Sequence, residues 1–220
     1  MKESKGLVKI ADGAATVEGL LVVPENAKGV ILFAHGSGSS RFSPRNNFVA
    51  DLLQQQGLAT LLMDLLTAEE DAVYANRFDI SRLTRRLVAV TQWVKSQPLL
   101  QELPLGYFGA STGAAVALQA AAALGETVAA IVSRGGRPDL AGNALLRVQA
   151  PVLLLVGGED MTVIALNRAA LSQLPCLKKL VLVPGAGHLF EEPGMLEEVA
   201  RQACAWFQEH LAASRSLSPS

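Results

Sequence analysis

The sequence predicts an α/β domain in which a mostly parallel central sheet is flanked by helices. Two observations lead to this prediction. Short apolar segments alternate along the chain with segments of helical periodicity, which is the order expected of a parallel sheet covered by helices. Several apolar segments are also continuous rather than alternating, as strands buried on both faces are. The 220 residues, half of them hydrophobic, suffice for one such domain, so we expect residues 1–220 to form a single domain.

The first half of the chain contains an expected hairpin, two strands and two helices. Asp12-Gly13 is a tight-turn sequence between two apolar segments and predicts the hairpin. A helix is predicted to start at Asp79, because Asp is a good N-cap and apolar residues then recur every three or four positions until Pro98. The expected elements are the hairpin strands 6–13 and 15–24, strand 29–36, helix 45–57, strand 58–66 and the helix from 79 to 98.

The second half continues the alternation. An apolar stretch at 105–110 leads into an alanine-rich helix, and three further apolar segments each end in glycine or polar residues. The last helix carries apolar residues on one face up to Leu211, and we expect residues from about 212 to 220 to form a disordered tail. The three segments are 128–133, 151–160 and 178–188.

Composition excludes several classes of function. The formal net charge is −1, so no general attraction to nucleic acid or to an anionic membrane is expected. The N-terminal residues lack the apolar core of a signal peptide, and no apolar run approaches the roughly 18 residues that span a bilayer. We therefore expect a cytoplasmic protein, a monomer or homodimer, whose Cys176 and Cys204 are reduced packing residues that bind no metal.

The segment Gly109-Ala110-Ser111-Thr112-Gly113 has the pattern G-x-S-x-G between an expected strand and an expected helix. Such a turn can expose a nucleophilic serine in a strained conformation that needs small neighbours. The alternative is a small-residue turn that lets helix and sheet approach closely, and the pattern alone does not separate the two.

Three chemically suited residues follow the ends of different predicted strands. Ligands of open α/β sheets bind at the carboxyl ends of the strands, where Ser111, Asp160 and His188 are expected. An imidazole can take the proton of a serine hydroxyl, and a carboxylate can fix the imidazole tautomer. Each residue alone could be an ordinary loop residue, but together they form a candidate nucleophile, acid and base.

Acyl transfer also needs backbone donors for an oxyanion. We expect these donors to be the N–H groups of Thr112, at the start of the helix after Ser111, and of Ser37, with Gly38 as the alternative to Ser37. A phosphate-binding loop is the other interpretation of residues 36–38, but no phosphate-binding motif follows. His35 is expected to brace this loop.

These motifs resemble the α/β-hydrolase superfamily, in particular its small dienelactone hydrolase-like members. The resemblance runs from about residue 14 to 211 and implies the α/β-hydrolase fold, a Ser111, Asp160, His188 triad and an oxyanion hole at Ser37 and Thr112. Dienelactone hydrolase itself uses a cysteine nucleophile, so the serine points to ordinary esters. The segments that carry it are HGSGSSRFSPRNNFVADLL (35–53), GASTGAA (109–115), VGGEDMTV (156–163) and PGAGHLFEEPG (184–194).

The arginines are open to two interpretations. Arg134 and Arg137 follow a predicted strand and could bind an anionic substrate group, or could simply be solvated loop residues. Arg82, Arg85 and Arg86 are interpreted as the solvated face of the helix that starts near residue 79. Since few residues separate Ser133 from Pro151, little or no cap domain is expected.

Two functions therefore remain in competition. The first is a serine hydrolase without a cofactor or metal that cleaves small carboxylic esters, or thioesters or lactones. The second is a catalytically silent scaffold that binds a ligand or protein partner. The complete set of serine, aspartate and histidine favours the first.

Overall fold

An eight-stranded sheet organises the computed structural model, which describes the backbone of residues 4–216 and the side chains of residues 4–213. The strand order is β1-β2-β4-β3-β5-β6-β7-β8. The hairpin is antiparallel within itself and to β4, whereas all other neighbouring strands are parallel. The strands are β1 (Ser4–Asp12), β2 (Ala15–Val23), β3 (Val30–Ala34), β4 (Ala59–Met63), β5 (Leu105–Ala110), β6 (Val128–Arg134), β7 (Val152–Gly157) and β8 (Lys178–Val183).

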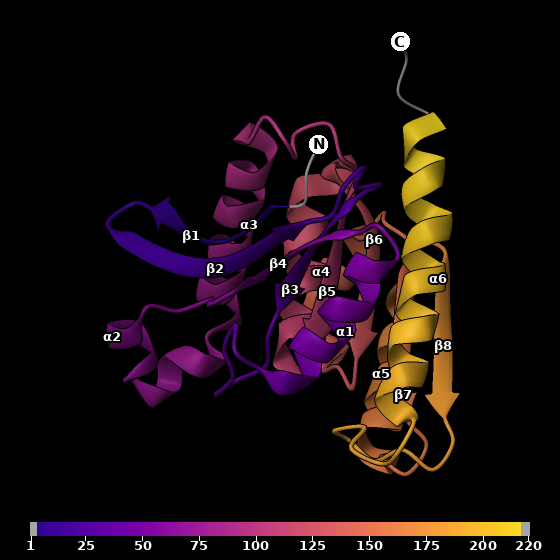
Figure 1. Ribbon diagram of the computed structural model, residues 1–220. Coiled ribbons are helices and arrows are strands. Elements are labelled where there is room, and N and C mark those ends of the chain that lie inside the picture. The colour runs from indigo at the N-terminus through magenta and orange to yellow at the C-terminus, as the bar shows by residue number, and fades with distance from the viewer. Residues whose placement is uncertain (1–3, 217–220) are drawn as a thin grey trace.

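Helices cover both faces of the sheet. In Figure 1 the helices α1 (Pro44–Gln55) and α6 (Met195–Ser216) lie in front of the sheet, and α3 (Ile80–Ser96), α4 (Thr112–Leu124) and α5 (Met161–Gln173) lie behind it. This is the predicted fold, a mostly parallel sheet flanked by helices. The remaining short elements are α2 (Ala68–Asp71), η1 (Tyr74–Phe78), η2 (Gly125–Thr127) and η3 (Pro138–Arg147).

The two faces of the sheet bury separate apolar cores. One core joins Tyr107 and Leu154 to α3 and α4, and the other joins Phe33 and Phe108 to α1 and α6. The side chains of β3, β5 and β7 are buried on both faces, which explains their continuous apolar sequences. These strands therefore place their carboxyl ends, and the residues that follow them, side by side.

Local sequence signals explain where several elements begin. The β1–β2 hairpin turns after Asp12, and Gly13 there has φ of +60°, which a glycine adopts without strain. The carboxylate of Asp79 caps α3 by accepting a hydrogen bond from the N–H of Arg82, as the sequence predicts. Between β6 and β7 the chain forms only the short helix η3, so this connection contains no cap domain.

Two expectations differ from the structure. Helix α6 continues to Ser216, so the residues between 212 and 216 are not a disordered tail; Ala212 and Ala213 are strong helix formers and prolong the helix. Residues 217–220 of the expected tail lie outside the described residues. Arg86 is not solvated: it is 4% exposed and paired with Asp12 and Glu70, because it faces the β1–β2 hairpin from α3.

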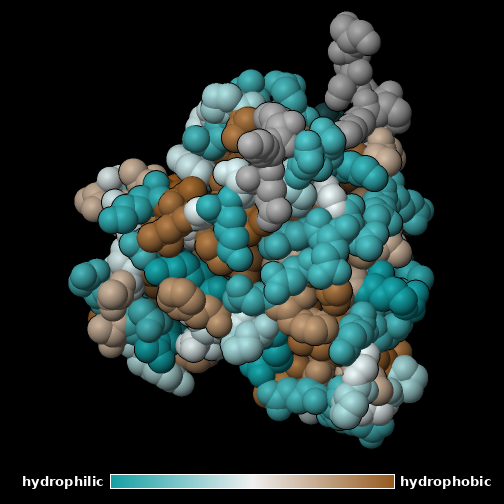
Figure 2. All heavy atoms as spheres, viewed as in Figure 1, coloured by the Kyte–Doolittle hydropathy of each residue, from teal (hydrophilic) through white to brown (hydrophobic). Residues whose placement is uncertain are grey.

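The surface is largely polar in the orientation of Figure 1. Figure 2 shows hydrophilic residues over most of this face, with hydrophobic residues over the β1–β2 hairpin, where Leu7 is exposed. Within the described part of the chain, no helix combines the length and the apolar composition needed to cross a membrane.

Candidate active site

Ser111 occupies a sharp turn between β5 and α4. Its φ of +50° lies in the left-handed region that L-residues rarely adopt, so the backbone is strained at this residue. The turn is held by hydrogen bonds on both sides: the N–H of Ser111 donates to the carbonyl of Arg134, and its carbonyl accepts from the N–H of Arg137. The strained conformation predicted from G-x-S-x-G is therefore present.

The two glycines of the motif are required by close backbone approach. A Cβ atom on Gly109 would lie 2.6 Å from the Cα of Ala114, and one on Gly113 would lie 2.1 Å from the carbonyl oxygen of Ala34. Both distances are far below van der Waals contact, so only glycine fits either position. The motif thus places the start of α4 directly against the end of β3.

Asp160 and His188 are joined by a hydrogen bond. The Nδ1–H of His188 donates to Oδ2 of Asp160 at 2.7 Å, while Oδ1 of Asp160 accepts from the N–H of Val163 and caps α5. The side chain of Asp160 is 16% exposed and that of His188 is 42% exposed. Because Nδ1 is occupied by the carboxylate, Nε2 is the nitrogen of His188 that remains for a substrate or nucleophile.

The loops that carry Asp160 and His188 are tied together by their backbones. The N–H of Glu159 donates to the carbonyl of Ala186 at 3.0 Å, and a Cβ on Gly157 would lie 2.3 Å from the carbonyl oxygen of Gly187. The ring of Phe190, two residues after His188, is buried in the core on the α1 and α6 face and anchors the histidine loop. The positions of both loops are therefore fixed by backbone contacts and by core packing.

Ser111 and His188 both lie near the Arg134-Gly135 segment that follows β6. The carbonyl oxygen of Arg134 accepts a hydrogen bond from the N–H of Ser111. A Cβ on Gly135, the next residue, would lie 3.7 Å from Cε1 of His188. The hydrogen bonds among the described residues do not include one between Ser111 Oγ and His188. The structure thus brings the two loops together at one sheet edge without a formed serine–histidine hydrogen bond.

The loop after β3 contacts the serine turn. A Cβ on Gly36 would lie 3.0 Å from Cβ of Ser111, and the N–H of Ser37 donates to Oγ1 of Thr112 at 2.9 Å. The Ser37 N–H expected to bind an oxyanion is therefore directed at the first residue of α4 and is held there by a hydroxyl. The Thr112 hydroxyl is a feature that the sequence interpretation missed.

His35 braces the same loop. Its Nε2 accepts from the N–H of Leu65 at 3.0 Å and its Nδ1–H donates to the carbonyl of Gly36 at 2.8 Å. Burial lowers the pKa of this imidazole, and the acceptor role of Nε2 also requires the neutral ring. His35 is thus a structural residue that fixes the position of the Ser37 loop.

The two candidate substrate-binding arginines differ in their surroundings. Arg137 forms two hydrogen bonds to the carboxylate of Asp139, and its side chain is 37% exposed. Arg134 is 8% exposed and forms no ion pair within the described part of the chain. The charge of Arg137 is already neutralised, whereas that of Arg134 is not.

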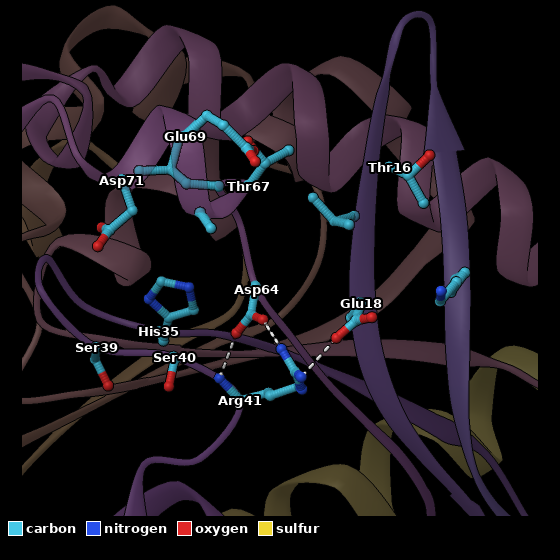
Figure 3. A pocket seen from close by; sticks show the side chains of 14 residues that line it. Thr16, Glu18, His35, Ser39, Ser40, Arg41, Asp64, Thr67, Glu69 and Asp71 are labelled. Atoms are coloured by element: carbon cyan, nitrogen blue, oxygen red, sulfur yellow. Dashed lines mark hydrogen bonds and ion pairs between the residues drawn. The ribbon is translucent and has the colours of Figure 1, made fainter.

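A hollow lies beside the loop that follows β3. It has a volume of about 570 Å³ and is lined by side chains from β2, from the loop after β3 and from the α2 region. Figure 3 shows its floor, where Arg41 links Glu18 to Asp64, and His35 at its side. Neither Ser111 nor His188 lines this hollow, so it gives no substrate pocket for them.

An ion pair connects helix α1 to the loop that carries His188. Arg45, in the first turn of α1, contacts Glu191 of the histidine loop at 2.6 Å. These residues are distant in sequence and carry no motif, so no sequence signal could have paired them. Among the described residues, no group of three His, Cys, Asp or Glu side chains is arranged to hold a metal ion.

The chain is similar to several known proteins. Two Mycobacterium tuberculosis proteins named "Putative phosphoribosyl transferase", from strains CDC 1551 / Oshkosh and H37Rv, are each 56% identical over 204 residues, which is 93% of this chain. The match covers 46% of each relative, so the chain spans about half the length of these curated relatives.

Among solved structures, a dienelactone hydrolase from Anabaena variabilis is 54% identical and superposes with a TM-score of 0.92, covering 96% of this chain and 99% of the other. Est1E from Butyrivibrio proteoclasticus shares the fold, with 18% identity, a TM-score of 0.80 and coverage of 94% and 99%. The model of the dienelactone hydrolase family matches residues 17–212. The eight-stranded sheet, the serine turn and these matches together show that the chain belongs to the dienelactone hydrolase family.

Proposed function

We propose that this protein is a serine hydrolase that cleaves small carboxylic esters without a cofactor, with thioesters and lactones as close variants. The observation that carries the proposal is the hydrogen-bonded Asp160–His188 pair at the same sheet edge as the strained Ser111. A φ of +50° is costly for a serine, and such strain is typical of functional sites.

The proposed reaction begins with proton transfer from Ser111 Oγ to Nε2 of His188 as the serine attacks the ester carbonyl carbon. Asp160 stabilises the resulting imidazolium through Nδ1–H. The tetrahedral intermediate then collapses, and His188 gives the proton to the leaving alkoxide to form an alcohol and an acyl-enzyme. Water, deprotonated by the same imidazole, attacks the acyl carbon, and collapse of the second intermediate releases the acid and restores the serine.

The N–H groups of Thr112 and Ser37 are the proposed oxyanion donors. The first N–H groups of a helix have no partner within the helix, and the positive end of the α4 dipole favours a negative oxygen there. The Ser37 N–H donates a hydrogen bond to the hydroxyl of Thr112. We propose that the substrate oxygen replaces this hydroxyl as the acceptor. Each such donor contributes roughly 3 to 4 kcal/mol to transition-state stabilisation.

The substrate is proposed to be small because the connection between β6 and β7 supplies no cap over the site. The half-exposed side chain of His188 fits an open site that admits compact or exposed acyl groups. The phosphoribosyl transferase name belongs to relatives of which more than half lies outside the match, and it assigns no residue of this chain to that activity.

The test is hydrolysis of p-nitrophenyl esters from acetate to decanoate by the wild type and by Ser111→Ala. Turnover that favours short chains and is lost in the variant supports the proposal. Ser172→Ala, which removes a surface hydroxyl bonded to the Ala169 carbonyl, is the matched control. If the folded wild type cleaves no ester and does not react with a fluorophosphonate, the silent scaffold is the better interpretation.

A further inference from the structure

Asn167, in the middle of α5, is a polar residue that is 0% exposed. Its Nδ2 donates to the carbonyl oxygen of Val163, one turn earlier in the same helix, at 2.8 Å, and to that of Gly136, outside the helix, at 2.9 Å. The two acceptors fix the orientation of the amide, because the reverse orientation would place Oδ1 against two carbonyl oxygens. The second bond joins α5 to the segment that follows β6.

Hydrogen bonding alone gives little reason for an asparagine at this position. Oδ1 of Asn167 is buried and has no hydrogen-bond partner among the described residues. A buried acceptor without a partner loses its hydration and gains nothing in exchange. The side chain thus satisfies the carbonyl of Gly136 but leaves its own oxygen without a partner. What it does supply is a fixed link between two segments of the chain.

The segment that contains Gly136 also holds the serine turn. The carbonyl of Arg134 accepts from the N–H of Ser111 at 3.2 Å, and the N–H of Arg137 donates to the carbonyl of Ser111 at 3.0 Å. A Cβ on Gly136 would lie 2.6 Å from the Cβ of Ala114, so the segment packs closely on the first turn of α4 as well. A displacement of Gly136 would therefore displace the serine turn with it.

The other end of the link lies on the helix that follows the proposed acid. Asp160 is the N-cap of α5: its Oδ1 accepts from the N–H of Val163 at 3.2 Å, and its Oδ2 accepts from Nδ1–H of His188 at 2.7 Å. Val163 is also the residue whose carbonyl accepts from Asn167. One buried amide therefore stands between the residues that hold the serine turn and those that hold the acid–base pair.

We propose that Asn167 is a positioning residue: its bond to the Gly136 carbonyl keeps the Ser111 turn at the correct distance from the acid–base pair. This inference rests on the proposed function and adds to it a residue that acts only through others. Proton transfer from a serine to an imidazole needs the two groups within hydrogen-bond reach, and a displacement of about 1 Å can lower a rate roughly 100-fold. The bond is suited to this role because it is buried, where water does not compete for its atoms.

The first test measures the link itself and needs no turnover. Asn167→Ser keeps the bond within the helix, since a serine hydroxyl can donate to the carbonyl four residues earlier, but its single donor cannot also serve Gly136. Asn167→Leu removes both bonds at similar volume. Amide hydrogen exchange is followed by NMR well below the melting temperature. We expect the N–H of Arg137, bonded to Ser111, to exchange up to about 10-fold faster in both variants. The N–H of Ile131, in the same strand as Arg134, should be unaffected.

The second test measures the reactivity of Ser111 with a fluorophosphonate and with p-nitrophenyl acetate. The end point of labelling counts the folded sites that can react, and the rate of labelling reports how reactive the serine is. For Asn167→Ser and Asn167→Leu we expect the end point of the wild type, a labelling rate and a kcat roughly 10- to 100-fold lower, and a nearly unchanged KM. A loss of folded protein alone would lower the end point and leave the rate of the remaining sites unchanged.

Thr91→Val is the matched control because it also removes a buried hydrogen bond between a helix and a strand. Thr91 is 1% exposed, and its hydroxyl donates to the carbonyl of Leu87 at 2.8 Å and is bonded to the hydroxyl of Tyr107 at 2.6 Å. We expect Thr91→Val to lower the melting temperature at least as much as Asn167→Ser does. Its kcat and labelling rate should equal those of the wild type.

The outcomes separate the inference from the proposed function. Unchanged exchange at Arg137 in Asn167→Ser overturns the link. A wild-type kcat and labelling rate in Asn167→Ser, with the loss confined to Asn167→Leu, or an equal loss in Thr91→Val, overturns the positioning role and leaves the serine hydrolase intact. If the wild type neither cleaves an ester nor reacts with the probe, the proposed function fails and exchange decides: faster exchange at Arg137 supports the link, and unchanged exchange refutes it.

Discussion

Replacing Gly113 by alanine tests whether the serine turn depends on the contact between α4 and β3. The added methyl carbon would lie 2.1 Å from the carbonyl oxygen of Ala34 and 2.6 Å from that of His35. Both atoms belong to the backbone, so no side-chain rotation can relieve the clash. The start of α4 must move away from the end of β3 by nearly an ångström.

The expected cost follows from two opposing terms. Overpacking of this kind destabilises by about 3 kcal/mol, the upper end of the usual range, because the neighbours cannot rotate away. Alanine in a helix is more favourable than glycine by about 1 kcal/mol. The net loss in the free energy of unfolding is therefore about 2 kcal/mol, which lowers the urea midpoint by about 1 M.

The assay is urea unfolding of the wild type, Gly113→Ala and Gly6→Ala, together with ester turnover in buffer. Gly6 is the matched control because a Cβ there meets no atom within 4 Å. The control midpoint is expected to equal or slightly exceed that of the wild type. If Gly113→Ala unfolds within 0.3 M of the control (about 0.6 kcal/mol at the same slope), the close approach does not constrain the turn and our explanation of the motif is wrong.

Three further predictions concern single residues. Asp160→Asn is expected to lower ester turnover by orders of magnitude and to keep the melting temperature, since Asn also caps a helix. Asp160→Ala is expected to lose the same activity and about 1 kcal/mol of stability as well. Equal turnover in Asp160→Asn and the wild type would contradict the role of this carboxylate. Because burial lowers the pKa of His35, the stability it gives is complete above its ordinary value of 6.5 and is lost as the pH falls through the folded-state pKa. The urea midpoint should therefore decline below about pH 6.5, and His35→Gln should flatten this decline. Arg86→Met is expected to lower the free energy of unfolding by about 2 kcal/mol. This loss is smaller than that from breaking a fully buried ion pair, because Asp12 and Glu70 are partly solvated. An unchanged urea midpoint would show that the ion pairs contribute nothing to stability.

The fold was predictable because its signals are local. Each strand of the parallel sheet is a short apolar run, and its end is marked by glycine or a polar residue. The hairpin turn at Gly13 and the cap at Asp79 were also correct, since each depends on a few adjacent residues. Helix α6 was predicted to end too early because the apolar face stops at Leu211, while the helix depends on backbone propensity beyond it.

The pairing of Asp160 with His188 was predictable for a different reason. Both residues follow strands that run in the same direction, so the topology alone brings their loops to one edge. The contacts of single side chains were not predictable in this way. Arg86 has the sequence context of a solvated helix residue, and only the position of the hairpin over α3 shows that it is buried.

The surroundings of Arg134 could not be predicted from the sequence. In sequence it is equivalent to Arg137, since both follow the same strand beside glycine. The structure separates them through their partners: Asp139 binds Arg137, whereas Nη1 of Arg134 has no hydrogen-bond partner among the described residues. The absence of a carboxylate within reach of a buried side chain cannot be read from a local pattern. The difference between Arg134 and Arg137 is therefore a property of the three-dimensional structure alone.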